Sequence, residues 1–440
     1  SSDVTVDGLT FINNSANYAG AVYTSGGNNN FKNLKFINNS AKKIAGALLG
    51  VAYLTMDNCT FIGNNASDAG AIDIYDVSGV TISNSKFEEN HATTRSGAIW
   101  FTSDNGNILN CNFTNNSAGR GGALGLNSRN SYVTGCNFIE NNASTYGGSI
   151  YITGYSINIL NSRFENNSAS NGSAIAIVGD PEFGTDSGTN NIIRNSTFDN
   201  NSARVNGGAI YIAGTSNTVD NSTFNNNSAR VNGGAVYIVG SINRITDSKF
   251  YDNHATDGGA VYIYRNNENR IANSIFIRNI AEQDGGGAYI NLQNGSSYVD
   301  WNLFSGNAVN NSGWLTWESN PGQHDIYYYI YNSYFEANRD YLMNVTAYVE
   351  FESSTALIVV RLPGPTRGSQ VKVTYSYYNT TQQAIITNEV YQTINPNVIA
   401  YISLYQLGDA VYNVTVGFSN DEYLYKSNTT NFTNAHAKGD

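Results

Sequence analysis

Three carboxylates in the second half of the chain stand at equivalent points of two neighbouring sequence repeats. Asp257 lies at the end of the turn segment of one repeat, and Glu282 and Asp284 lie at the end of the same segment in the next repeat. Oxygen ligands of this kind are those that Ca²⁺ prefers, so the group could hold a calcium ion. A solvated acidic turn is the simpler interpretation and is favoured. The sequence suggests no other cofactor.

Aromatic residues recur two positions after the alanine of a repeated Gly-Ala pair. They are Tyr211, Tyr237 and Tyr262, with Trp100 and Tyr151 earlier in the chain. Alternation along a strand predicts that this position points outward. An exposed aromatic stripe is a platform for sugar rings or a protein partner. The alternative is self-stacking that only stiffens the sheet. If the stripe binds, replacing the three tyrosines by serine should abolish binding and leave the melting temperature nearly unchanged.

A second aromatic patch follows where the repeat degenerates. Trp314 and Trp317 join Trp301 there, and a run of tyrosines comes next, from Tyr327 to Tyr334. Trp314 and Trp317 are candidate ligand-binding residues, although a plug that covers the last coil is the simpler interpretation. An inserted loop, Asp180 to Gly188, could also carry recognition.

The chain lacks the residue combinations that polysaccharide-cleaving sites need. No Asp-Asp, Gly-His-Gly or Arg-x-Lys occurs, and His91 and His254 merely replace a turn serine. Glycosidases need two carboxylates that flank one bond. We therefore predict that the protein is not an enzyme. A polysaccharide lyase or glycoside hydrolase is kept as an alternative.

A repeat of 25 or 26 residues must position these side chains. It is counted most easily from thirteen phenylalanines, each followed three residues later by asparagine: Phe11, Phe36, Phe61, Phe87, Phe113, Phe138, Phe164, Phe198, Phe224, Phe250, Phe276, Phe304 and Phe335. Short alternating strands between Asn-Gly-rich turns at this period are typical of a parallel β-helix. We predict a right-handed parallel β-helix of about thirteen coils over residues 1–340.

Each repeated residue type then has an expected role. Phenylalanines should stack inside as a ladder, and Phe224 should lie between Phe198 and Phe250. The third residue after each phenylalanine, an asparagine, should turn the chain and bond the next coil. The glycine before alanine should permit a bend. Three cysteines, Cys59, Cys111 and Cys136, share the inward position before phenylalanine and should be buried free thiols.

The sequence pattern of residues 341–440 predicts a second domain of a different kind. Plain alternation, as in TALIVVRL and QVKVTYSYY, replaces the repeat. Six or seven such strands suggest an immunoglobulin-like β-sandwich. Tyr412, two positions before Val414, suits a tyrosine corner.

The composition limits the partners. The chain has 440 residues, a net charge of −11 and few helix-favouring residues. This charge argues against a nucleic-acid partner. No apolar run is long enough to span a membrane in this fragment.

The Gly-Gly-Ala-Ile motif at Gly207–Ile210 and the Phe-x-x-Asn motif at Phe224–Asn227 resemble repeats of the chlamydial polymorphic outer-membrane proteins. The Asn-Asn-Ser-Ala segments and the C-terminal module are more similar to adhesin-like surface proteins of methanogenic archaea. This resemblance implies an extracellular, cell-surface location and adhesion.

From these features we predict a cell-surface adhesin. Its β-helix should bind a glycan or protein on the surface of another cell, with the sandwich as a stalk. A structural surface-layer component is a further alternative, which would need no specific partner.

Overall fold

The computed structural model describes residues 3–179, 187–264, 268–291, 297–300, 302–305, 307–309, 328–331, 334–335, 344–349, 356–361, 370–393, 399–405, 407, 410–418 and 428–434. The chain forms two compact units, residues 1–298 with 308–328, and residues 299–307 with 329–440. The boundary predicted after residue 340 lies outside the described residues. In the part of the chain that is described, no helix is long and apolar enough to cross a membrane.

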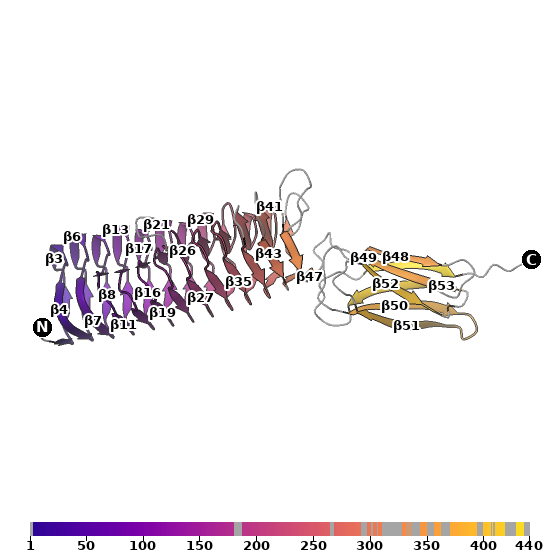
Figure 1. Ribbon diagram of the computed structural model, residues 1–440, viewed down its shortest axis with the longest axis horizontal. Helices are drawn as coiled ribbons and strands as arrows, with labels where there is room; N and C mark the ends of the chain where they lie inside the picture. Colours follow the sequence, from indigo (N-terminus) through magenta and orange to yellow (C-terminus); the bar gives the residue numbers. More distant parts are fainter. Residues whose placement is uncertain are drawn as a thin grey trace, which may run out of the picture. The chain divides into compact units, whose positions relative to one another are not determined.

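The first unit is a parallel β-helix whose strands stack from coil to coil in three sheets (Figure 1). Sheet A takes two strands from most coils and contains β1 (Val4–Asp7), β4 (Val22–Lys32), β7 (Leu48–Asp57), β10 (Ile72–Ile74), β11 (Thr81–Ser83), β14 (Ile99–Phe101), β15 (Asn107–Leu109), β18 (Leu124–Leu126), β19 (Tyr132–Thr134), β22 (Ile150–Ile152), β23 (Asn158–Leu160), β26 (Ile175–Ile177), β27 (Ile192–Arg194), β30 (Ile210–Ile212), β31 (Thr218–Asp220), β34 (Val236–Ile238), β35 (Arg244–Thr246), β38 (Val261–Tyr264), β39 (Arg270–Ala272), β42 (Ala288–Asn291) and β43 (Ser297–Asp300).

Sheet B carries the phenylalanines and contains β2 (Thr10–Ile12), β5 (Lys35–Ile37), β8 (Thr60–Ile62), β12 (Lys86–Glu88), β16 (Asn112–Thr114), β20 (Asn137–Ile139), β24 (Arg163–Glu165), β28 (Thr197–Asp199), β32 (Thr223–Asn225), β36 (Lys249–Tyr251) and β40 (Ile275–Ile277). Sheet C contains β3 (Ser15–Tyr18), β6 (Ser40–Ile44), β9 (Asn65–Asp68), β13 (His91–Arg95), β17 (Ser117–Arg120), β21 (Asn142–Tyr146), β25 (Ser168–Asn171), β29 (Ser202–Asn206), β33 (Ser228–Ala229), β37 (His254–Asp257), β41 (Ile280–Asp284) and β45 (Ala308–Val309). Three further short strands are β44 (Leu303–Ser305), β46 (Tyr328–Tyr331) and β47 (Tyr334–Phe335).

The phenylalanine ladder is confirmed. Rings from Phe11 to Phe276 stack without a break, with neighbouring ring centroids 4.6–4.9 Å apart. The register also pairs Phe304 with Phe335, so all thirteen predicted phenylalanines lie on β-strands. Each ring packs face to face on the rings of the coils above and below, and the stack fills the core at the spacing of parallel strands.

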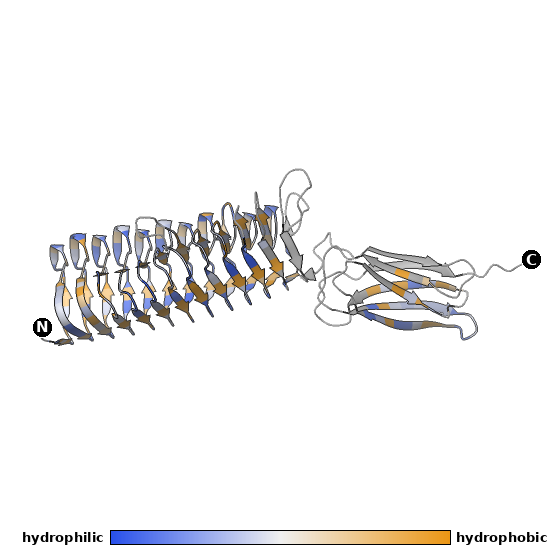
Figure 2. Ribbon diagram, in the orientation of Figure 1, coloured by the Kyte–Doolittle hydropathy of each residue, from blue (hydrophilic) through white to orange (hydrophobic). Residues whose placement is uncertain are grey.

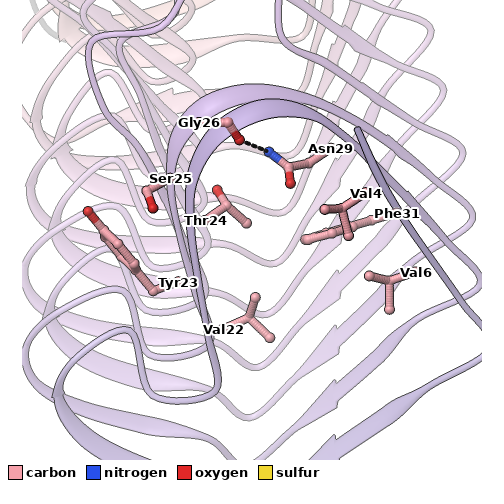
Figure 3. A pocket seen from close by; sticks show the side chains of 9 residues that line it. All are labelled: Val4, Val6, Val22, Tyr23, Thr24, Ser25, Gly26, Asn29 and Phe31. Carbon is pink, nitrogen blue, oxygen red and sulfur yellow. Dashed lines mark hydrogen bonds between the residues drawn. The ribbon is translucent and has the colours of Figure 1, made fainter. Parts of the chain in front are cut away.

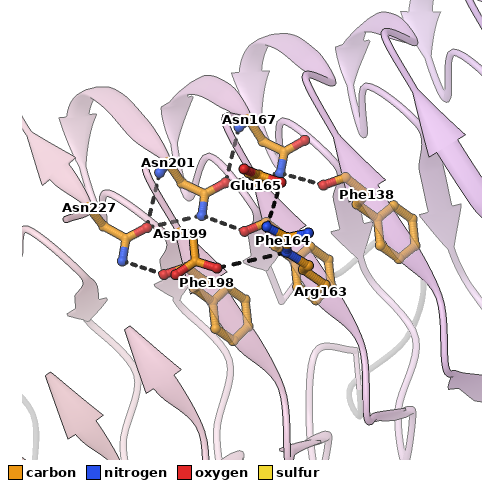
Figure 4. Close-up of polar contacts among 9 residues, drawn as sticks. All are labelled: Phe138, Arg163, Phe164, Glu165, Asn167, Phe198, Asp199, Asn201 and Asn227. Atoms are coloured by element: carbon orange, nitrogen blue, oxygen red, sulfur yellow. Dashed lines mark hydrogen bonds and ion pairs between the residues drawn. The ribbon is translucent and has the colours of Figure 1, made fainter. Parts of the chain in front are cut away.

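The asparagine ladder is confirmed as well (Figure 4). In Asn201, Nδ2 donates to Oδ1 of Asn227 at 3.0 Å and to the carbonyl of Phe164 at 3.1 Å. Its backbone N–H donates to the same Oδ1 at 3.0 Å. Each buried amide therefore connects three successive coils and satisfies backbone groups that the turn leaves without a strand partner.

One turn prediction is wrong in its position. The ladder asparagine does not itself make the left-handed turn; the residue before it does, as at Asn200 (φ 55°) and Asn226 (φ 54°). The ladder side chain must point inward to bond its neighbours, so the exposed residue before it takes the left-handed conformation that asparagine tolerates.

The recurrent glycine before alanine has a different role from the bend we predicted. A Cβ built on Gly208 would lie 1.8 Å from the carbonyl oxygen of Gly234 in the next coil. Glycine at this position therefore allows the close approach of two backbones, although one coil has Ser173 at the equivalent point.

Apart from the asparagine ladder and serines such as Ser196, the buried side chains are mostly apolar. Figure 2 shows apolar and polar residues together along the strands of the β-helix. Cys59, Cys111 and Cys136 are buried free thiols, as predicted. Burial raises the pKa of Cys59 to about 11, which keeps this thiol neutral.

The second unit contains two antiparallel sheets. The first is β48 (Asn344–Val349), β49 (Ala356–Arg361) and β52 (Ile399–Leu404), and the second is β51 (Ala384–Thr393), β50 (Gln370–Asn379), β53 (Ala410–Phe418) and β54 (Asn428–Asn434). Seven strands distributed in this way agree in part with the predicted immunoglobulin-like sandwich. Tyr412 is buried in β53, against the rings of Tyr375 and Tyr377.

Candidate binding faces of the β-helix

The predicted aromatic stripe is one row of register partners on the outer side of sheet A. We name it the central row; its eleven members are Tyr23, Leu49, Asp73, Trp100, Gly125, Tyr151, Ala176, Tyr211, Tyr237, Tyr262 and Tyr289. The row extends the predicted stripe by Tyr289 at one end. It is interrupted by glycine, alanine and a carboxylate.

The expectation that this stripe is exposed is wrong. Trp100 and Tyr151 are 4% exposed, Tyr262 is 5% and Tyr237 is 7%, while Tyr211 is half-buried. Tyr237 stacks on Tyr211 and on Tyr262 with centroids 5.4 Å apart on each side. These contacts match the self-stacking alternative.

Two features of the fold cover the central row. Side chains two positions further along sheet A, such as Val239 and Tyr264, pack against the rings. On the side of the row that faces sheet C, the turn from sheet C to sheet A contains a glycine that lies directly beside the row. A Cβ built on Gly258 would lie 3.0 Å from the Cβ of Tyr262. The row thus lies in the corner between sheets C and A. Side chains there point away from the core and are still buried.

The aromatic side chains of the described β-helix that remain exposed lie in earlier coils: Tyr18, Tyr23, Tyr53, Tyr75 and Tyr132.

Two arginines cover the earlier aromatics of the central row. The guanidinium carbon of Arg95 lies 4.4 Å from the ring centroid of Trp100, and that of Arg120 lies 5.8 Å from the ring of Tyr151. Arg95 and Arg120 are register partners at the ends of β13 and β17. Cation–π contacts of this kind hold each guanidinium group over its ring.

A buried carboxyl group, that of Asp73, lies near Arg95. Asp73 is 4% exposed, and its Oδ1 is buried with no hydrogen-bond partner. Burial raises the pKa of Asp73 to about 7, although the charge of Arg95 acts in the opposite direction. Arg95 is paired with Asp68 instead, at 3.3 Å between Nη2 and Oδ2. Thr94 also donates a hydrogen bond to Asp68.

The three carboxylates that could have held calcium do not form one ligand group. Asp257 and Asp284 are register partners, whereas Glu282 faces His254, with 3.7 Å between Oε1 and Nε2. Glu282 and Asp284 lie two residues apart on β41, where Glu282 is exposed and Asp284 is half-buried beside the corner. In the described ranges, no group of three or more His, Cys, Asp or Glu side chains is placed to hold a metal ion.

Some predicted residues cannot be placed. Trp314 and Trp317 lie outside the described residues, as do Trp301 and residues 180–186 of the inserted loop.

A cavity of about 450 Å³ lies in the first coil (Figure 3). Val22 and Phe31 are among its walls, and their register partners in the next coil, Leu48 and Met56, are fully buried core residues. The cavity therefore borders the buried core of the second coil.

The outer face of sheet C is the exposed surface that the sequence reasoning missed. We name it the sheet C face; from β6 to the residues after β33 its polar and charged members are Lys42, Lys43, Ser67, Asp68, Thr93, Thr94, Arg95, Arg120, Ser144, Thr145, Ser170, Arg204 and Arg230. The signal in the sequence is the segment after each inward alanine, as in SAKKI, HATTR, SAGR and SARVN. The inward alanines, such as Ala203 and Ala229, fill the core behind it.

Comparison with known proteins identifies the fold. A family described as right handed beta helix region matches residues 47–231. No curated protein matches the chain. The first unit is thus a right-handed parallel β-helix, as predicted. Because this fold supports both enzymes and non-enzymes, the match identifies an architecture and no activity.

Proposed function

We propose that this protein is an extracellular, cell-surface adhesin. Its β-helix binds a glycan or protein on another cell's surface, and the sandwich unit serves as a stalk. The observation that carries this proposal is the sheet C face, which runs unbroken over successive coils. Lys42, Thr93 and Arg204 are exposed there, and all three belong to strands whose opposite side is core.

Two further features support a binding role. A solenoid is rigid along the stack because each coil pairs with its neighbours, so it presents side chains at fixed intervals. Exposed polar side chains on such a scaffold are available for recognition without any change in the core.

The test is binding of the fluorescently labelled whole chain to panels of microbial and animal cells. We expect saturable binding that unlabelled chain competes away. The surface-layer alternative predicts self-assembly without saturable binding to any cell, and that combination would replace the adhesin proposal.

One observation favours polysaccharide cleavage as a second candidate function. Asp73 has a pKa near neutrality beside a second carboxylate, Asp68, a combination that can separate acid and base roles. Asp73 would have to become accessible to a sugar, since it is buried here. Release of reducing ends or unsaturated uronates from pectin-like polysaccharide, lost in Asp73→Asn, would establish this activity.

A further inference from the structure

Between β6 and the residues after β33, the sheet C face carries a charge opposite to that of the chain, whereas the later strands β37 and β41 carry Asp257, Glu282 and Asp284. From β6 to the residues after β33 it holds six cations (Lys42, Lys43, Arg95, Arg120, Arg204 and Arg230) and one carboxylate, Asp68. The whole chain has a net charge of −11. Glu89 and Glu140 lie at the turns before β13 and β21, at the opposite end of these strands from the arginines. A positive surface on an acidic protein focuses the attraction of anions onto that one face.

The protein itself neutralises little of this charge. Arg95 pairs with Asp68, while Lys43 and Arg204 bond only neutral groups: the Tyr18 hydroxyl at 3.0 Å, and the Ser144 carbonyl and Ser170 hydroxyl at 2.6 and 3.1 Å. Among the described residues, Lys42, Arg120 and Arg230 make no ion pair. The cations are thus available to an external anion.

Arg95 and Arg120 form the best-organised part of the face. They are one coil apart in register, and each lies over an aromatic ring of the central row. The Nε of Arg95 is buried and has no partner. Arg95 lies over Trp100 of its own coil, and Arg120 lies over Tyr151 of the following coil. The guanidinium fork of arginine matches the geometry of carboxylate or sulfate oxygens.

We propose that the sheet C face binds an acidic polysaccharide, whose carboxylate or sulfate groups contact Arg95 and Arg120. This inference rests on the proposed adhesin function and names its ligand class. Cations recur from β6 to the residues after β33, seven coil steps and so roughly 35 Å, which fits a linear polymer better than a small ion.

The side chains between the cations favour sugar over nucleic acid. Thr93, Thr94, Ser144 and Thr145 are exposed and carry hydroxyl groups that match sugar hydroxyls. Single-stranded nucleic acid would need exposed aromatic platforms for its bases. Trp100 and Tyr151, which lie next to Arg95 and Arg120, are buried beneath these arginines, and Tyr18 beside Lys43 is the exposed aromatic at the start of sheet C.

The experiment measures binding of the whole chain to four immobilised polymers: polygalacturonate, dextran sulfate, neutral dextran and single-stranded DNA. We expect binding to polygalacturonate, dextran sulfate or both, none to dextran, and weakening between about 50 and 500 mM NaCl. The first two polymers distinguish carboxylate from sulfate recognition. The double variant R95Q/R120Q should lose about tenfold or more in affinity, because charge-assisted hydrogen bonds are lost.

A matched control is available on sheet A. Arg244 and Arg270 are also exposed register partners in adjacent coils, so R244Q/R270Q makes the same charge change on another face. It should alter affinity less than about twofold. Since Arg95 covers Trp100, melting is compared for each variant, and K42Q/K43Q, at fully exposed positions, provides a second test that should also weaken binding.

The inference would be overturned if R95Q/R120Q and R244Q/R270Q lost affinity equally. It would also be overturned if the chain bound neither acidic polymer. DNA binding as tight as polysaccharide binding would overturn it as well and assign the face to nucleic acid. If the chain binds cells and R95Q/R120Q binds them equally well, adhesion stands and this ligand class fails.

Discussion

At the scale of single residues, Asp73 makes stability depend on pH. Burial raises the pKa of Asp73 to about 7, so the folded chain keeps a proton that the unfolded chain releases above about pH 4. The stability that this proton contributes is fully present below about pH 4 and is lost as the pH rises to about 7. Asp73→Asn should therefore match the wild type near pH 4 and exceed it near pH 8 by on the order of a few kcal/mol. Urea unfolding at both pH values measures the difference.

Asp68→Asn is the control, because Asp68 is partly exposed and paired with Arg95. It should bring no gain near pH 8. An Asp73→Asn effect of the same size at both pH values would show that the carboxyl does not titrate in this range.

Phe224 tests the core at the same scale. Its ring lies 4.6 Å from that of Phe198 and 4.7 Å from that of Phe250, and it is fully buried. Phe224→Ala should lower the free energy of unfolding by about 3–5 kcal/mol, since the coils above and below prevent collapse of the cavity. Chemical denaturation measures the change. A loss below about 1 kcal/mol with an intact fold would contradict the ladder.

At the scale of elements, the central row contributes to stability across strands β30, β34 and β38. The triple change of Tyr211, Tyr237 and Tyr262 to serine was expected to leave melting unchanged if these rings were exposed. Because Tyr237 and Tyr262 are buried and stacked, we now expect a clear fall in melting temperature. The control is Tyr75→Ser, at an exposed tyrosine of the same unit, which should change melting little. An unchanged melting temperature of the triple variant would show that these rings are exposed after all.

At the scale of the whole molecule, the chain contains two compact units with separate cores. Units with their own cores can unfold in separate transitions. We expect guanidinium unfolding to show two transitions, one shifted by Phe224→Ala and the other by Ile358→Ala, a fully buried position of the sandwich. A single transition shifted by both variants would show that the units unfold together.

The sequence alone determined the coil, its period and its inward side. Phe224 and Cys111 could be placed in the core from spacing, because parallel stacking forces equivalent residues into one row and alternation decides which side of a strand they occupy. The antiparallel second unit followed from alternation in the same way.

Only the tertiary structure decided which outward side chains meet solvent. Tyr237 and Arg204 both point away from the core, yet Tyr237 lies in the corner between sheets C and A and Arg204 on an open face. The angle between two sheets is set by the turn that joins them, here a glycine close to the next backbone, and alternation carries no information about that angle. The collection of scattered lysines and arginines into one basic face likewise depends on the stacking register, which brings residues 25 or 26 positions apart into adjacent coils.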